Sequence, residues 1–178
     1  WKSDGTETGT VMVKDINAGA GSSSPSHLVN VNGSLFFTAN DGVNGTELWK
    51  SDGTVASTVV VKDINIGTNS SNPSFLANEN GILFFRANDG ISGTEFWKSD
   101  GTETGTVMVK DINAGAGNSN PILFTNINGT LYFVANNGIS GSELWKSDGT
   151  EVGTVLIKDI RTGTVSSTSN ELTNVNGI

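Results

Sequence analysis

Four tryptophans recur at a constant spacing of 48 residues and could present one chemical group per repeat. They are Trp1, Trp49, Trp97 and Trp145. An indole ring packs well between apolar side chains, and its flat face can also stack on the apolar face of a sugar ring. Packing between repeated units is the expected use of these rings. The alternative is a multivalent glycan-binding site with one ring per unit.

Acidic side chains precede the tryptophans and could supply oxygen ligands for calcium. The acidic pairs are Asp41 with Glu47 and Asp89 with Glu95. Calcium takes six to eight oxygen ligands, several of them from carboxylates clustered in one loop. The loop 40–47 offers fewer, it lacks closely alternating aspartates, and Asn137 replaces the aspartate in the third copy. We therefore expect ordinary Asp-Gly turns here, with a weak calcium site as the alternative and no other cofactor.

Residues that commonly carry catalysis are scarce. His27 is the only histidine, the other copies have no histidine at its position, and the chain has no cysteine. Neither the G-x-S-x-G nucleophile turn nor a phosphate-binding glycine loop occurs. An active site usually breaks symmetry, whereas this chain repeats itself almost unchanged. The sequence therefore predicts a protein that is not an enzyme.

The charge of the chain limits its partners. The formal net charge is −8 and the isoelectric point is about 4.4. Nucleic-acid binding needs a basic surface that displaces counterions from phosphates, so this class of partner is not expected. No apolar run approaches membrane-spanning length, so we expect no membrane insertion of this segment.

The 48-residue repeat decides the fold class, because a fixed period of this size is typical of stacked repeat units. Within the second unit the expected strands are residues 27–32, 34–40, 46–51 and 57–64, joined by turns such as Asn32-Gly33. Side chains alternate along a strand, so Phe36 should face away from Leu35 and Phe37, and Val61 away from Val60 and Ile64. Burial of both faces requires a neighbour on each side of the unit.

These observations predict one all-β repeat domain over residues 1–178, built as a β-propeller of four-stranded antiparallel blades. An open β-solenoid or linear array is the alternative. The complete blades are expected at 27–64, 75–112 and 123–160, with partial blades at 1–16 and 171–178. The partial blades suggest a segment of a longer array, whose partners are neighbouring repeats or other copies of the chain.

The motif Glu-Leu-Trp-Lys-Ser-Asp-Gly-Thr stands at 47–54 and 143–150, with a phenylalanine variant at 95–102. The chain resembles the bacterial ELWxxDGT repeat proteins over its whole length. That resemblance implies propeller-like repeats in a secreted or surface-attached protein, with a non-catalytic role such as adhesion or matrix formation. It implies no particular site residues. Surface glycans are a further partner expected under the lectin-like alternative.

Overall fold

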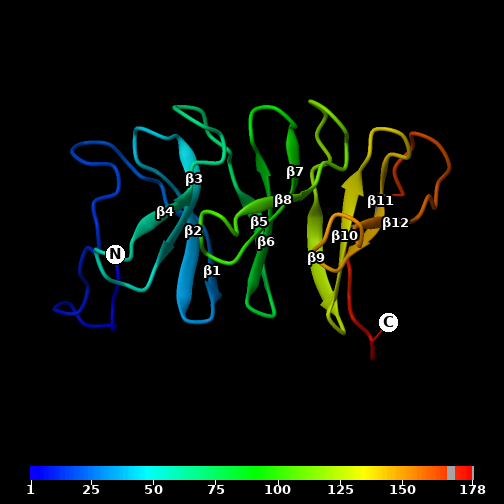
Figure 1. The fold of residues 1–178 in the computed structure, drawn as a ribbon. Helices are drawn as coiled ribbons and strands as arrows, with labels where there is room; N and C mark the ends of the chain where they lie inside the picture. The colour runs from blue at the N-terminus through cyan, green and yellow to red at the C-terminus, as the bar shows by residue number, and fades with distance from the viewer. Residues whose placement is uncertain (168–170, 178) are drawn as a thin grey trace.

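The computed structural model describes residues 1–167 and 171–177, and these contain twelve strands and no helix. The strands form three separate antiparallel sheets of four, each confined to one repeat (Figure 1). The all-β prediction with four-stranded antiparallel units is therefore confirmed. The strands are β1 (Ser26–Val31), β2 (Ser34–Asn40), β3 (Thr46–Ser51), β4 (Val59–Lys62), β5 (Ser74–Glu79), β6 (Ile82–Asn88), β7 (Thr94–Ser99), β8 (Val107–Lys110), β9 (Ile122–Ile127), β10 (Thr130–Asn136), β11 (Ser142–Ser147) and β12 (Val155–Lys158).

Each sheet is a meander in which consecutive strands pair. The strand orders are β1-β2-β3-β4, β5-β6-β7-β8 and β9-β10-β11-β12. The first hairpin of the first sheet turns at Asn32 and Gly33, both at positive φ, as a tight two-residue turn requires. The central pair β2 and β3 is in continuous register from Asn40 opposite Thr46 to Leu35 opposite Ser51. The side chains of these two strands therefore share two well-defined faces.

The first strand of each sheet contains an irregularity at one repeated position. His27, Phe75 and Leu123 have φ values of 53°, 56° and 62°, which are unusual for residues with a side chain. The pairing of β1 with β2 shifts register at this point, between Ser26 and Val29. The extra residue of such a bulge adopts the unfavourable backbone conformation so that pairing can resume beyond it.

Apolar residues from both faces of the first two sheets, and from one face of the third, pack against a neighbouring unit. Phe36 joins a core shared with the second sheet, whereas Phe37 and Leu35 join a core that includes Ile16 of the N-terminal segment. The predicted alternation along this strand is confirmed. The second and third sheets share a further core that contains Phe96 and Phe133, whose ring centroids are 4.7 Å apart.

The three sheets stand side by side, with their first strands next to one another (Figure 1). β5 lies beside both β1 and β9. Asn78 Nδ2 donates a hydrogen bond of 2.8 Å to the carbonyl oxygen of Asn30 across the first of these contacts. The Asn78 amide therefore joins the first two sheets.

The two ends of the described chain do not form the strands expected there. Residues 1–16 contain only an isolated bridge between Lys2 and Val11, and residues 171–177 contain no strand. Within the described residues neither segment has a counterpart of the second strand beside it, so most of its backbone groups have no ladder partner there. The expected partial unit at 171–178 also includes residue 178, which lies outside the described residues.

Candidate functional site

The repeated tryptophans are mostly buried between units. Trp49, Trp97 and Trp145 are each 6% exposed, and each lies in an apolar core that includes residues of the preceding unit. Trp145 Nε1 donates to the carbonyl oxygen of Ala135 at 3.1 Å. A ring whose faces are covered by a neighbouring unit cannot stack on a sugar. These three residues therefore serve packing in this structure.

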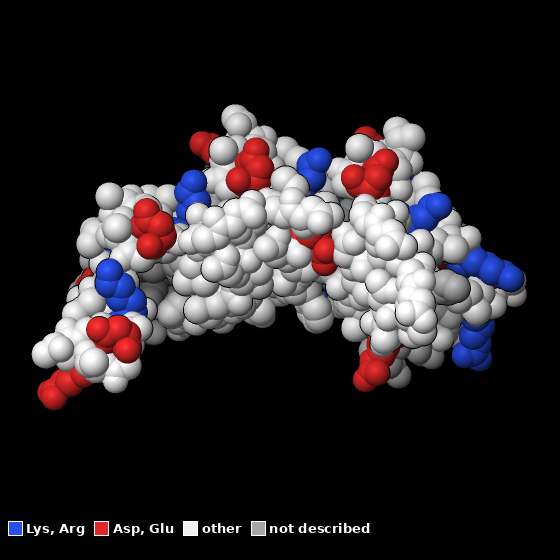
Figure 2. Space-filling view, turned by 90° about the horizontal axis from the view of Figure 1, so that it is seen from below, with Lys and Arg blue, Asp and Glu red and all other residues white. Residues whose placement is uncertain are grey.

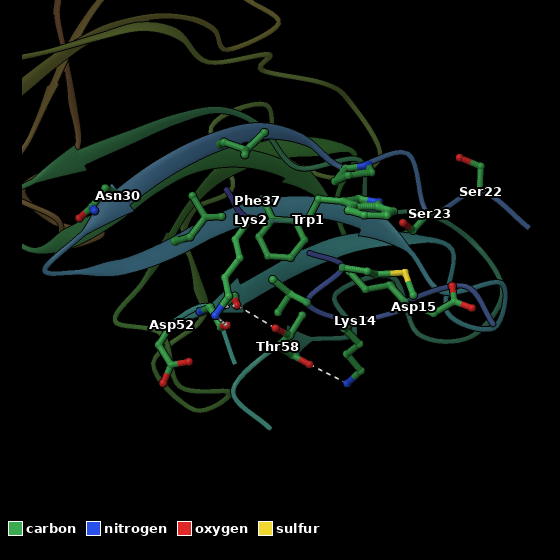
Figure 3. A pocket seen from close by; sticks show the side chains of 18 of the residues that line it. Trp1, Lys2, Lys14, Asp15, Ser22, Ser23, Asn30, Phe37, Asp52 and Thr58 are labelled. Atoms are coloured by element: carbon green, nitrogen blue, oxygen red, sulfur yellow. Dashed lines mark hydrogen bonds between the residues drawn. The ribbon is translucent and has the colours of Figure 1, made fainter. Parts of the chain in front are cut away.

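Trp1 differs from the other three, because 82% of its surface is exposed. It is among the residues lining a hollow of about 570 Å³ between the N-terminal segment and the first sheet (Figure 3). The hollow is bordered by apolar Leu35 and Phe37 and by polar Lys14 and Asp52. Of the four tryptophans, for which glycan stacking was the alternative to packing, Trp1 alone has a free ring face.

The loop aspartates, expected in turns with calcium binding as the alternative, are used inside their own turns. Asp41 Oδ1 accepts hydrogen bonds from the backbone N–H groups of Val43 at 2.9 Å and Asn44 at 2.7 Å. Asp89 accepts from Ile91 and Ser92 at the same distances. These are the contacts of an Asx turn. Within residues 1–167 and 171–177, no group of three or more acidic or histidine side chains could hold a metal ion.

The glutamates considered as the other calcium ligands are buried, and they accept hydrogen bonds from the segment that follows each sheet. Glu47, Glu95 and Glu143 are all fully buried, with 0% exposure. Glu95 accepts from the backbone N–H groups of Ile112 and Ser119, both at 2.8 Å, and from the Ser119 hydroxyl at 2.6 Å. Each glutamate thereby holds the segment that follows its own sheet, and for Glu47 and Glu95 this is the linker to the next sheet. Asp89 and Glu95 are therefore bound to different partners and do not form one ligand-binding site.

Sequence reasoning missed this role of the glutamates, although one signal for it was available. The glutamate is identical in all three complete units, whereas the neighbouring loop aspartate is Asp41, Asp89 and then Asn137. A side chain that the repeats never exchange while its neighbour varies is under a tighter structural constraint. The donors of its hydrogen bonds lie 17 and 24 residues further along the chain, so spacing alone could not reveal them.

Two lysines of the N-terminal segment, and two of each of the first two units, donate to backbone carbonyls of the following unit. Lys98 Nζ reaches the Gly149 carbonyl oxygen at 2.8 Å, and Lys110 Nζ reaches that of Thr154 at 2.9 Å. Both acceptors belong to the Asp-Gly-Thr turn that follows the next tryptophan. The same pairs occur earlier in the chain, as Lys2 with Gly53, Lys14 with Thr58, Lys50 with Gly101 and Lys62 with Thr106. Lys14, Lys62 and Lys110, each followed by an aspartate, thus find their partner on a neighbouring unit rather than in that aspartate.

Burial changes the pKa of Glu47 and Glu95 in a direction that can be tested. Burial raises the pKa of Glu47 and Glu95 above their ordinary value of 4.5, and hydrogen bonds from the linker oppose this only in part. In the turns, hydroxyl and backbone hydrogen bonds from Thr102 lower the pKa of Asp100. The two kinds of carboxyl group therefore respond to acidification at different pH values.

Acidification from neutral pH to about pH 4.5 is expected to strengthen the contribution of Glu47 and Glu95 to stability. Because their folded pKa lies above the unfolded value, the folded state binds the proton more tightly. This contribution is fully present below the unfolded pKa and is lost as pH rises through the folded pKa. Chemical denaturation across this range measures it, and Glu95→Gln should show a smaller change with pH than the unmodified chain. Equal changes in both proteins would contradict the expectation.

Comparisons with known proteins give no family. The sequence matches no protein-family model and no curated protein. Among solved structures, the chain is similar to the crystal structure of the computationally designed Ika8 protein, with a TM-score of 0.41 and 14% sequence identity. The match covers 78% of this chain and 38% of that one, so the chain spans well under half the length of the designed protein. The described residues contain no helix that could cross a membrane.

Proposed function

We propose that this chain is a non-catalytic structural or adhesive scaffold of a secreted or surface-attached bacterial protein, similar to the ELWxxDGT repeat proteins. One observation carries the proposal. The repeated side chains that could do chemistry are used to join one unit to the next. In the second sheet, Trp97 packs on the preceding unit, Glu95 holds the linker and Lys98 binds the following turn.

We further propose that the sheets are blades of a β-propeller. The adjacent first strands and the packing of each sheet on the next along the chain support this arrangement. In a propeller the first strands would line the central channel, where Asn30 and Asn78 already join two sheets. A linear array of the same sheets is the competing arrangement, and it would share the scaffold role.

The scaffold proposal is tested by adding candidate ligands to the purified chain. Tryptophan fluorescence is recorded during titration with a panel of oligosaccharides, and thermal unfolding is followed with calcium and with a chelator. Because Trp49, Trp97 and Trp145 are covered, we expect no saturable fluorescence change, and because Asp41 and Asp89 are engaged in their turns, we expect an unchanged Tm.

Two outcomes would replace the scaffold by another function. A saturable fluorescence change with one saccharide, abolished by Trp1→Ala, would establish glycan binding at the exposed ring. A Tm that falls on chelation and recovers with calcium, but not with magnesium, would establish a calcium-stabilised module. Trp1→Ala is a suitable control because the ring is 82% exposed, so its removal should leave the fold intact.

A further inference from the structure

The contact between successive units is built repeatedly from two complementary halves. One half is a sheet face with apolar side chains and two lysines, which we call the lysine face. The other half is a tryptophan followed by an Asp-Gly-Thr turn, which we call the tryptophan hairpin. Between the first two sheets, Trp97 packs with Phe36 and Leu48, while Lys50 and Lys62 donate to the turn that follows Trp97.

The third sheet presents a lysine face that no other described unit covers. Ile157 is 42% exposed there, whereas its counterpart Val61 in the first sheet is 5% exposed. Leu144 is half-buried, whereas its counterpart Leu48 has no exposed surface. Together with Tyr132, Leu144 lines a hollow of about 380 Å³. The apolar side chains of this face therefore correspond to those buried at the internal contacts but are more exposed to solvent.

The two lysines of this face are also open to solvent. Lys146 and Lys158 are exposed, and within the described residues neither ammonium group donates a hydrogen bond. Their counterparts Lys98 and Lys110 each bind a carbonyl oxygen of the following unit. One free lysine on a surface is ordinary. Here two free lysines occupy the positions that bind the next turn at the internal contacts, and they lie beside an apolar hollow. This surface can therefore bind the same kind of turn.

The first residues of the chain are a tryptophan hairpin that no described unit covers on its tryptophan side. Trp1 is 82% exposed and Met12 55%. The hairpin contains the carbonyl groups of Gly5 and Thr10, and their counterparts accept lysine hydrogen bonds at every internal contact. These counterparts are Gly53 with Thr58, Gly101 with Thr106, and Gly149 with Thr154.

The charges at the two ends also complement each other. Lys146, Lys158 and Arg161 are exposed on the third unit, and Figure 2 shows basic side chains gathered at that end of the molecule. Asp4 and Glu7 are exposed in the N-terminal hairpin, and acidic side chains lie at the opposite tip in the same view. Opposite charges at two surfaces steer their approach and suppress the alternative pairings of like ends.

We propose that the lysine face of the third sheet binds the tryptophan hairpin of a second copy of this chain, head to tail. Trp1 of one copy enters the hollow beside Tyr132 and Leu144 of the other. Lys146 and Lys158 then donate to the carbonyl oxygens of Gly5 and Thr10, as the corresponding lysines do at the internal contacts. This contact follows from the unit-to-unit packing and does not depend on the scaffold role.

The geometry of the contact sets its consequences. The two surfaces are different, so association is heterologous and leads to a closed ring or to an open filament rather than to a two-fold dimer. Leu172 of the C-terminal segment lines the same hollow. In the repeat, this segment corresponds to the first strand of a further unit, and the hairpin of the second copy would add to that unit. Neither copy supplies a counterpart of β2 to that unit. We therefore expect weaker binding than an internal contact would give, with exchange between free and bound chains.

Sedimentation velocity of the 178-residue chain, from about 1 µM to about 1 mM, tests the proposal. We expect the mean mass to rise with concentration and the tryptophan emission to shift to the blue as Trp1 enters the hollow. Trp1→Ala should weaken association about 10- to 30-fold, as for a tryptophan at the centre of an interface. Lys146→Met combined with Lys158→Met should weaken it as well, and more strongly at low salt than at high salt.

Matched variants separate this contact from non-specific association. Ile91→Ser removes an apolar side chain that is 79% exposed but lies on the middle unit, so association should be unchanged. Circular dichroism and thermal unfolding at low concentration show whether each variant keeps its fold. A chain that stays monomeric across the whole range overturns the proposal. Association that is equally strong in the Trp1→Ala chain overturns it too, because the contact then uses another surface.

Discussion

Replacing Glu95 by alanine is expected to lower the free energy of unfolding by about 3 kcal/mol. The carboxylate is fully buried and accepts three hydrogen bonds, two from backbone N–H groups and one from the Ser119 hydroxyl. Alanine leaves the Ile112 N–H without its acceptor, while the Ser119 N–H and hydroxyl keep only their longer hydrogen bonds to the Thr94 carbonyl oxygen, at 3.1 and 3.3 Å. Removing the carboxylate also removes an unfavourably buried charge, which offsets part of this cost. That burial is unfavourable for the charge is seen in the raised pKa of Glu95. Urea denaturation at neutral pH measures the difference.

Two further variants decide whether the effect belongs to these hydrogen bonds. Glu95→Gln keeps the shape and one acceptor oxygen, so it should cost less than alanine. Glu103→Ala removes an exposed glutamate from a turn of the same unit and should change stability by less than about 0.5 kcal/mol. If Glu95→Ala were as mild as Glu103→Ala, the linker would be held by other contacts, and the assigned role of the glutamate would be wrong.

Trp97→Ala is expected to destabilise the chain by about 3–5 kcal/mol. The ring is 6% exposed and belongs to the core between the first two sheets, together with Phe36 and Phe85. Its removal leaves a cavity that both sheets would have to move to fill. Its indole N–H has no partner within the described residues, so the loss comes from packing. Thermal and urea unfolding of the purified variant give the value.

Trp1→Ala is the matched control, because Trp1 occupies the same place in an identical stretch of sequence. Residues 1–21 and 97–117 are the same, yet Trp1 is 82% exposed and Trp97 is 6% exposed. At a concentration where the chain is monomeric, Trp1→Ala should change stability by less than about 0.5 kcal/mol. Equal effects of the two substitutions would mean that the ring stabilises its own hairpin rather than the contact with the preceding unit.

Local patterns predicted the strands well. The expected ranges 34–40 and 46–51 agree with β2 and β3, and the opposite directions of Phe36 and Phe37 follow from the two-residue period of a strand. One expectation on the last strand was wrong. Ile64 packs with Val61 rather than on the opposite side, because it lies beyond the end of β4 at Lys62, where the alternation no longer applies.

The candidate sites were harder to predict, because their meaning depends on residues far along the chain. Asp41 and Glu47 look alike as oxygen ligands in the sequence, but one closes a local turn and the other binds Ser71 of the linker. The spacing of the tryptophans indicated either packing or sugar stacking. Only the position of the neighbouring unit decided between these uses, since it covers three of the rings and leaves Trp1 free.

The repeat, the strands and the all-β class could be predicted from the sequence alone, since they depend on period, alternation and turn residues within one unit. The tertiary structure decided how the units are joined. Lys98 finds its carbonyl 51 residues away, and the two identical tryptophan stretches differ in burial because only one has a unit before it within the described chain. A contact between units is a property of neighbours, so identical sequences can have different environments.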